Sequence, residues 1–366
     1  MYIQIVIVSI SLLFLQHAIR IAYIMGYHVT VHNHTPGRCS VVPGVDHGAE
    51  DMETLADGRA FITSGFQWPL SSKHFKQLYK DQGRKGKVLL FDFNKPESGV
   101  TELAMDPQFD GENFHPHGIS VLQDPDSGKI FLFIVNHPEG KDTVEKFEFI
   151  QEKLALEHIE TFSDSTFRVL NDVAATSENS FYVTNYVHSK SSSLSFIEII
   201  LLLPWGSVVY YDGANYNVVA DSLVIPNGIL LSKDKRYVYL ANNFFASISI
   251  FERDEDDRLT ILQEFPIHSY PDNLSLEPKT GNLLIGSIPV VYMMIKHMEA
   301  PDVDMAPSKV LYINMDNATT VGEITDLYTN DGRQISGCSS ATIYDNKMLM
   351  GSVVDRLVYC DVRTWE

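Results

Sequence analysis

The stretch that decides the fold is NGILLSKDKRYVYL, residues 227–240. It has two short apolar runs separated by a polar turn, a pattern that predicts two neighbouring strands. The amide of Asn227 stands directly before the first run, where a side chain of this kind is uncommon.

The same pattern recurs along most of the chain. Polar residues also precede apolar runs at Glu50-Asp51, His117-Gly118-Ile119, Asn171-Asp172 and Asp272-Asn273-Leu274, with a weaker sixth segment at 339–343. Steps of about 45–70 residues suit the four-stranded blades of a propeller. We therefore predict an all-β fold, a six-bladed β-propeller whose equivalent polar residues meet at a central channel. Five unrelated turns before five strands are the alternative.

Composition limits the classes of function. The chain has 366 residues, 45% of them hydrophobic, and a formal net charge of −19. Binding to nucleic acid is disfavoured, because phosphate contacts need clustered lysine and arginine. The acidic balance suits divalent cations, although it also suits simple solubility.

The first 25 residues are almost entirely apolar, with Arg20 as the only charge. Residues 1–25 are predicted to be either a signal peptide or a retained hydrophobic anchor, and residues 39–366 to form the propeller domain. A buried core helix is the less favoured third explanation. Either of the first two places the protein in the secretory pathway, as an extracellular or membrane-anchored protein.

The cysteine count fits that compartment. Three cysteines allow at most one internal disulfide and leave one thiol, and a bond between Cys39 and Cys360 would join the two ends of the propeller. Closing so long a loop stabilises by roughly 4–5 kcal/mol in the chain-entropy model. The sequence predicts glycosylation at Asn33 and Asn317, which both lie in Asn-X-Thr motifs.

Two segments interrupt the strand pattern. Residues 196–203 are strongly apolar and are interpreted as a short helix or a surface lid, which would face a membrane or a partner if exposed, with a buried connector as the alternative. Residues 290–304, with methionines in and beside them, are interpreted as a flexible excursion between blades.

The recurring polar residues form a set of oxygen ligands. They are Glu50, Asn171, Asn227, Asp272 and Asn273. Two carboxylates with three amides suit calcium better than magnesium, which keeps more water, or zinc, which prefers histidine and cysteine. A second ion could be held by Asp51, Asp172 and the backbone carbonyl of Ile119. Asn273 also lies in a glycosylation motif, but its assignment to the metal makes a glycan there unexpected.

Two histidines add acid–base capacity. His117 lies in one of the recurring segments, and His137 ends the next predicted strand. An imidazole beside a Lewis-acidic ion can take a proton from water, and a second imidazole can orient the first. An ordinary core or surface role is the alternative for each.

These residues stand in motifs that resemble the paraoxonase family of arylesterases and lactonases. The matching motifs are GAED (48–51), FITSG (61–65), PHGIS (116–120), VNHP (135–138), LND (170–172), NGI (227–229), YVY (237–239), DN (272–273) and LVYC (357–360). The resemblance implies a six-bladed propeller with two Ca²⁺ ions. It places the catalytic ion on Glu50, Asn171, Asn227, Asp272 and Asn273, and the structural ion on Asp51, Asp172 and Ile119. It also implies a His117–His137 dyad, a Cys39–Cys360 disulfide and contact with a lipid surface or membrane through the N-terminus.

The chain departs from the family pattern at the expected substrate pocket, where it has Trp68, Tyr186, Ser287 and Ile288, and it has an extra cysteine at Cys338. We expect a calcium-dependent hydrolase of lactones and aryl esters, in which His117 activates water and His137 assists, with Asp272 or Glu50 as the alternative base. The organophosphate side activity, the physiological lactone and the oligomeric state stay open. A non-catalytic, membrane-anchored assembly factor and a sugar lactonase are the competing hypotheses.

Overall fold

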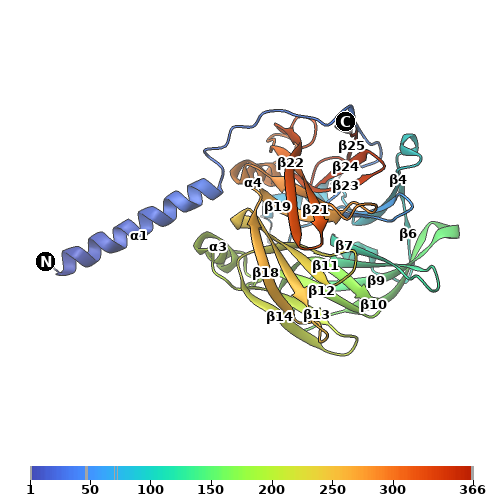
Figure 1. The fold of residues 1–366 in the computed structure, drawn as a ribbon, viewed down its shortest axis with the longest axis horizontal. Coiled ribbons are helices and arrows are strands. Elements are labelled where there is room, and N and C mark those ends of the chain that lie inside the picture. The colour runs from blue at the N-terminus through green and yellow to red at the C-terminus, as the bar shows by residue number, and fades with distance from the viewer. Residues whose placement is uncertain (1, 46–47, 70, 72, 364–366) are drawn as a thin grey trace.

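The computed structural model describes residues 2–45, 48–69, 71 and 73–363. Its strands form six sheets, which are the blades of a propeller (Figure 1). The first sheet contains β2 (Met52–Thr54), β3 (Arg59–Ser64), β4 (Lys87–Asp92) and β5 (Val100–Glu102). The second contains β7 (Pro116–Gln123), β8 (Ile130–Asn136), β9 (Thr143–Ile150), β10 (Ala155–Phe162) and the short parallel β6 (Ala104–Met105).

The next three sheets follow in chain order. The third contains β11 (Val169–Ser177), β12 (Ser180–Val187), β13 (Gly206–Tyr211) and β14 (Tyr216–Leu223). The fourth contains β15 (Pro226–Leu231), β16 (Tyr237–Asn242), β17 (Ser247–Arg253) and β18 (Leu259–Pro266). The fifth contains β19 (Tyr270–Leu276), β20 (Leu283–Ile288), β21 (Ser308–Asn317) and β22 (Thr320–Asn330).

The sixth sheet closes the ring. It contains β23 (Cys338–Tyr344), β24 (Lys347–Ser352), β25 (Val358–Asp361) and, paired outside β25, the early strand β1 (Cys39–Val41). Cys39 lies opposite Cys360 in the register, and the two form a disulfide. The first strand of each blade contacts the first strand of both neighbouring blades, all the way round from β2 to β23. The predicted six-bladed propeller and its disulfide are therefore confirmed.

Five of the six first strands, all except β2, share an irregularity. Their pairing with the second strand shifts register between Pro116 and Ile119, Leu170 and Val173, Pro226 and Ile229, Pro271 and Leu274, and Cys338 and Ser340. Such bulges re-aim side chains at functional edges of a sheet. The residues skipped by the pairing are the polar pairs that recur in the sequence, so the bulge explains why polar side chains precede each apolar run.

The core lies between the blades. Phe61 of the first blade packs with Phe147 and Leu132 of the second, and all three are fully buried. Equivalent clusters join the other neighbouring blades. Each blade therefore buries its two faces against its neighbours, as a ring of sheets requires.

Among the described residues, four α-helices lie outside the sheets: α1 (Tyr2–Ile24), α2 (Lys73–Asp81), α3 (Ser192–Leu201) and α4 (Val291–Glu299). Single 3₁₀ turns occur at Pro96–Ser98, Gly111–Asn113, Gln151–Lys153 and Asn243–Phe245. α1 projects from the propeller (Figure 1), and by length and composition it could cross a membrane.

Two of the sequence interpretations need correction. The apolar segment 196–203 lies mostly in α3, which confirms the short helix, but it is not a buried connector, since Phe196 and Ile197 are 65% and 48% exposed. Residues 291–299, interpreted as part of a flexible excursion, form the regular helix α4, whose residues Val291, Met294 and His297 are buried.

Candidate active site

The bulges gather the predicted oxygen ligands at one end of the channel. Glu50 precedes β2, while the other four come from β11, β15 and β19, and all five are at least 93% buried. The Nδ2 of Asn273 donates to Glu50 Oε1 at 2.9 Å and to the Glu50 carbonyl. The Ser339 hydroxyl donates to the same carbonyl at 2.6 Å, so the weak sixth segment also contributes at the axis.

Several of these oxygens lack a hydrogen-bond partner. Glu50 Oε2, Asn171 Oδ1 and Asn227 Oδ1 are buried and unpaired. Such groups are costly unless something compensates them. No group of three or more His, Cys, Asp or Glu side chains in the described part of the chain is arranged as a metal site. The donor set depends on amides instead, and buried, unpaired amide and carboxylate oxygens fit a hard cation such as calcium.

The electrostatics agree with that fit. Burial, opposed by the Asn273 hydrogen bond and the charge of His137, raises the pKa of Glu50 to about 8. Burial and the charge of Glu50 raise the pKa of Asp272 well above its usual range. Two carboxyl groups in this position favour their neutral forms unless a positive charge joins them.

In the second predicted set, Asp51 and Asp172 directly follow Glu50 and Asn171 along the chain. Asp51 accepts the N–H groups of Met52 and Ile119, at 2.8 and 2.9 Å. Asp172 accepts those of Val173 and Ile229, both at 2.7 Å. Each aspartate therefore ties the first strand of its blade to that of the next. Burial raises both pKa values; the charge of Glu50 adds to the rise for Asp51, and the charge of Asp51 adds to the rise for Asp172.

Gly118 allows β7 to approach Asp172 of β11 closely. A Cβ added to Gly118 would overlap Asp172 Oδ1 and the Asp172 backbone. Asp51, Asp172 and Ile119 line one cavity of about 230 Å³, which brings together the three residues predicted to hold the structural ion.

The two predicted histidines form a buried pair. His117 Nδ1 lies 3.0 Å from His137 Nε2, and His117 Nε2 lies 3.5 Å from Glu50 Oε1. Burial lowers the pKa of His117 to about 3 and also lowers the pKa of His137. Both rings are therefore neutral at physiological pH, which is the form that can accept a proton.

Sequence reasoning missed a third member of this group. Asp142, between β8 and β9, places Oδ2 at 3.1 Å from His137 Nδ1. The same oxygen accepts the N–H of Leu170 at 2.8 Å, and the residue is 94% buried. Asp142 lies in a turn outside the recurring segments, so no repeat indicated it. Its distance of five residues from His137, across a hairpin, was the available signal.

An apolar cavity of about 320 Å³ opens above the oxygens and His117. Three of the four pocket residues that depart from the family pattern line it: Trp68, Tyr186 and Ile288, but not Ser287. The Trp68 ring lies 5.6 Å from the His117 ring and 5.4 Å from the Tyr186 ring, both edge-on. Phe196 and Ile199 of α3 and Met294 and Ile295 of α4 form its outer wall, together with Met25 just beyond α1. The site is thus a polar floor under an apolar chamber.

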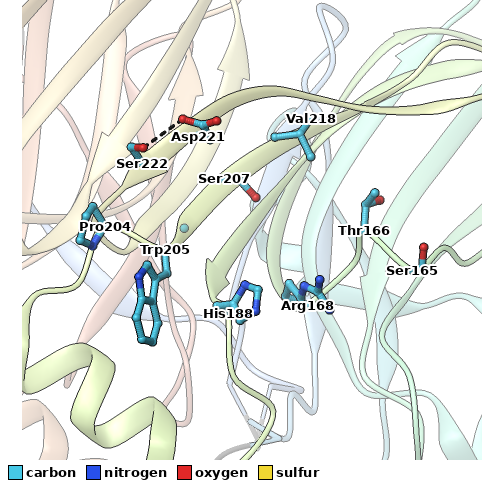
Figure 2. Close-up of a pocket in the computed structure, with 11 residues that line it drawn as sticks. Ser165, Thr166, Arg168, His188, Pro204, Trp205, Ser207, Val218, Asp221 and Ser222 are labelled. Atoms are coloured by element: carbon cyan, nitrogen blue, oxygen red, sulfur yellow. Dashed lines mark hydrogen bonds between the residues drawn. The ribbon is translucent and has the colours of Figure 1, made fainter.

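Cavity size alone does not indicate the site. A larger depression of about 650 Å³ lies on the third blade, between Arg168, His188 and Trp205 (Figure 2). It contains none of the predicted ligands. The hydroxyl of Ser222 there donates a hydrogen bond to Asp221 Oδ1, with 3.0 Å between the two oxygens.

Comparison with known proteins places the chain in two steps. Solved structures share its fold: a luciferin-regenerating enzyme has a TM-score of 0.52 at 10% identity and covers 88% of this chain and 94% of that one. A putative gluconolactonase has a TM-score of 0.51 at 10% identity and covers 92% and 100%. At such identities the likeness concerns the fold alone.

The family follows from sequence. The family model described as Arylesterase matches residues 30–362, and the chain belongs to this family of ester hydrolases. It is 34% identical over 325 residues to human (Homo sapiens) serum paraoxonase/arylesterase 1, with 88% of each chain covered. It is 33% identical to serum paraoxonase/arylesterase 2 of Gallus gallus, with the same coverage, and 32% identical to serum paraoxonase/lactonase 3 of Oryctolagus cuniculus, with 89% of each covered.

Proposed function

We propose that this arylesterase-family member is a calcium-dependent hydrolase of lactones and aryl esters. The observation that carries the proposal is the juxtaposition of three unpaired buried oxygens with a neutral histidine pair beneath an apolar cavity. Glu50, Asn171, Asn227, Asp272 and Asn273 would hold the catalytic ion. When bound, the ion supplies a Lewis acid that polarises the ester carbonyl and stabilises the oxyanion.

The residues of the chain divide the remaining work. Neutral His117 takes the proton from the attacking water, and His137 accepts a hydrogen bond from His117 and keeps the ring in place. Glu50 and Asp272 remain the alternative bases, but as ligands they would have their oxygens engaged. Trp68, Tyr186 and Phe66 exclude water and favour apolar acyl or aryl groups.

Asp51, Asp172 and the Ile119 carbonyl, which share a separate cavity, would hold a second, structural calcium. This set has two carboxylates that repel each other in the ion-free chain. Its role would be to fix the first strands of three neighbouring blades rather than to take part in chemistry.

Hydrolysis of a lactone and an aryl ester by the purified full-length chain, assayed with calcium and with a chelator, tests the proposal. Loss of activity on chelation and its return with calcium are expected. Activity that survives complete removal of calcium would refute the mechanism. A calcium-replete protein without any hydrolysis would favour the non-catalytic assembly factor, which no specific contact supports at present.

We also propose that α1 is retained as a lipid-surface anchor. The C-terminal end of α1 packs against the propeller, where Ile24 is 96% buried among Leu202, Phe244 and Val291. The Tyr270 hydroxyl donates to the Tyr23 carbonyl at 3.2 Å. Removal of a signal peptide by cleavage after residue 25 would discard these contacts. Intact mass and N-terminal sequencing of the mature protein test this proposal, and a mature chain that begins after Met25 overturns it.

We propose that Asn33 and Asn317 are glycosylated, because an attached glycan needs an exposed side chain. Both side chains are exposed, and Asn317 lies at the tight turn between β21 and β22. Asn273 is 98% buried, which excludes a glycan in the folded protein. A mass shift on enzymatic deglycosylation, lost in Asn317→Gln and Asn33→Gln, is the expected result.

A further inference from the structure

The hydrogen positions on the histidine pair depend on what lies at its two ends. One end is Asp142, with Oδ2 at 3.1 Å from His137 Nδ1, and the other is Glu50, with Oε1 at 3.5 Å from His117 Nε2. A neutral imidazole carries one N–H and one lone pair, so the two ends compete to set the direction of the whole chain of hydrogen bonds. The direction decides whether His117 presents a lone pair or an N–H to Glu50 and the cavity.

The Asp142 end is the stronger of the two. An ionised carboxylate only accepts hydrogen bonds, and the N–H of Leu170 already holds Asp142 Oδ2 in place. The Oδ2 atom is off the line of a regular hydrogen bond to Nδ1, so attraction between charge and ring N–H contributes most. Burial tends to raise the pKa of Asp142, but His137 and the Leu170 N–H outweigh it and lower the pKa. Asp142 is therefore ionised at physiological pH.

Glu50 is the weaker competitor. Its contact with His117 is longer, and Asn273 already donates to the same Oε1 atom. Engagement of the Glu50 carboxylate by a cation would weaken it further as an acceptor for His117.

We propose that Asp142 is a positioning residue that sets the tautomers of both histidines. This inference rests on the proposed hydrolytic function. The charge of the Asp142 carboxylate favours the proton on His137 Nδ1, the His137 Nε2 lone pair then accepts the Nδ1–H of His117, and the His117 Nε2 lone pair is left facing Glu50 and the cavity floor. The proton of the attacking water then moves to His117 Nε2. The charge so created on His117 is stabilised through His137 by the carboxylate of Asp142.

The first test reads tautomers directly, without activity. Side-chain ¹⁵N NMR of histidine-labelled full-length protein in detergent, with calcium, should show Nδ1–H forms for both rings, assigned with His117→Gln and His137→Gln. In Asp142→Ala the pattern should move toward the Nε2–H form. An unchanged ¹⁵N pattern in Asp142→Ala overturns the proposal, whether or not the protein proves to be a hydrolase.

The second test uses turnover. Asp142→Ala should lower kcat for an aryl ester roughly 10–100-fold, the usual effect of losing a residue that orients a functional group, with KM and calcium affinity unchanged. Formate should restore part of kcat in Asp142→Ala. Asp142→Asn keeps an acceptor for Leu170 without the charge, so it should fold but shift the ¹⁵N pattern toward the Nε2–H form and show a reduced kcat.

Asp106→Ala is the matched control. Asp106 belongs to the same blade, accepts the backbone N–H groups of Gln108 and His158, and contacts neither ring of the pair. It should leave kcat and the ¹⁵N pattern unchanged. Normal kcat in both Asp142 variants contradicts the inference, whereas a wild type without calcium-dependent hydrolysis contradicts the proposed function alone.

Discussion

Removal of the catalytic calcium should leave a protein whose stability falls as pH rises. In the ion-free chain, burial raises the pKa of Glu50 from 4.5 to about 8. Between these two values the folded chain binds one proton more than the unfolded chain, so the free energy of unfolding decreases with pH. Below pH 4.5 Glu50 causes almost no loss of unfolding free energy, and above pH 8 the loss is nearly complete.

The magnitude follows from the shift. Each unit of pKa difference corresponds to about 1.4 kcal/mol, so Glu50 alone costs the ion-free chain about 5 kcal/mol at high pH. That corresponds to roughly 6 °C in Tm for a chain of this length. Between pH 6 and pH 8 the loss is about 2 kcal/mol.

Glu50→Gln isolates this contribution. His117 and His137, whose pKa values burial lowers, act in the opposite direction, but they are common to both proteins and cancel in the difference. Urea unfolding of the full-length protein in detergent and chelator should show wild type losing about 2 kcal/mol more than Glu50→Gln between pH 6 and pH 8.

With calcium bound, wild type should be more stable to unfolding than Glu50→Gln, because the ion compensates the buried charge of Glu50 and binds only the folded chain. Identical pH dependence of the chelated wild type and Glu50→Gln would refute the reasoning. So would a wild-type protein that is no more stable with saturating calcium than without it.

Three further outcomes are expected. His117→Gln should lower lactone turnover 10²–10⁴-fold, the usual contribution of a general base, without changing calcium affinity measured by titration; near-normal turnover would make His117 a pocket residue only. Cys39→Ser should lower the free energy of unfolding by about 5 kcal/mol, because its bond to Cys360 closes a loop of 321 residues, and reductant should have no additional effect on the variant. Phe61→Ala should cost about 3–5 kcal/mol in urea unfolding, whereas Phe245→Ala, at a side chain 42% exposed, should cost much less; equal losses would contradict the packing between blades.

The sequence was sufficient to predict the propeller and most of the floor of the site. Asn227 and Asp272 could be found because the fold repeats, and equivalent positions of repeated blades converge on one axis. The repeat can be recognised in the sequence because polar residues at the bulges stand next to apolar runs.

Residues outside the repeat could not be found in this way. Asp142 reaches His137 through a hairpin whose geometry depends on the folded blade, and Ser339 contributes through a hydroxyl that resembles any turn residue. α4 was mistaken for an irregular segment because its nine residues, Val291–Glu299, have no side-chain cap at the N-terminus and gain stability from packing over the cavity.

The partnership of β1 with β25 has a consequence for biosynthesis. Every other blade draws on one continuous segment, but the last sheet needs strands from opposite extremes of the polypeptide. The final blade therefore cannot assemble before β25 is made, and β1 must wait without its partner until residue 361 has left the ribosome. Closure of the circle, with the Cys39–Cys360 bond, necessarily follows the synthesis of all six blades.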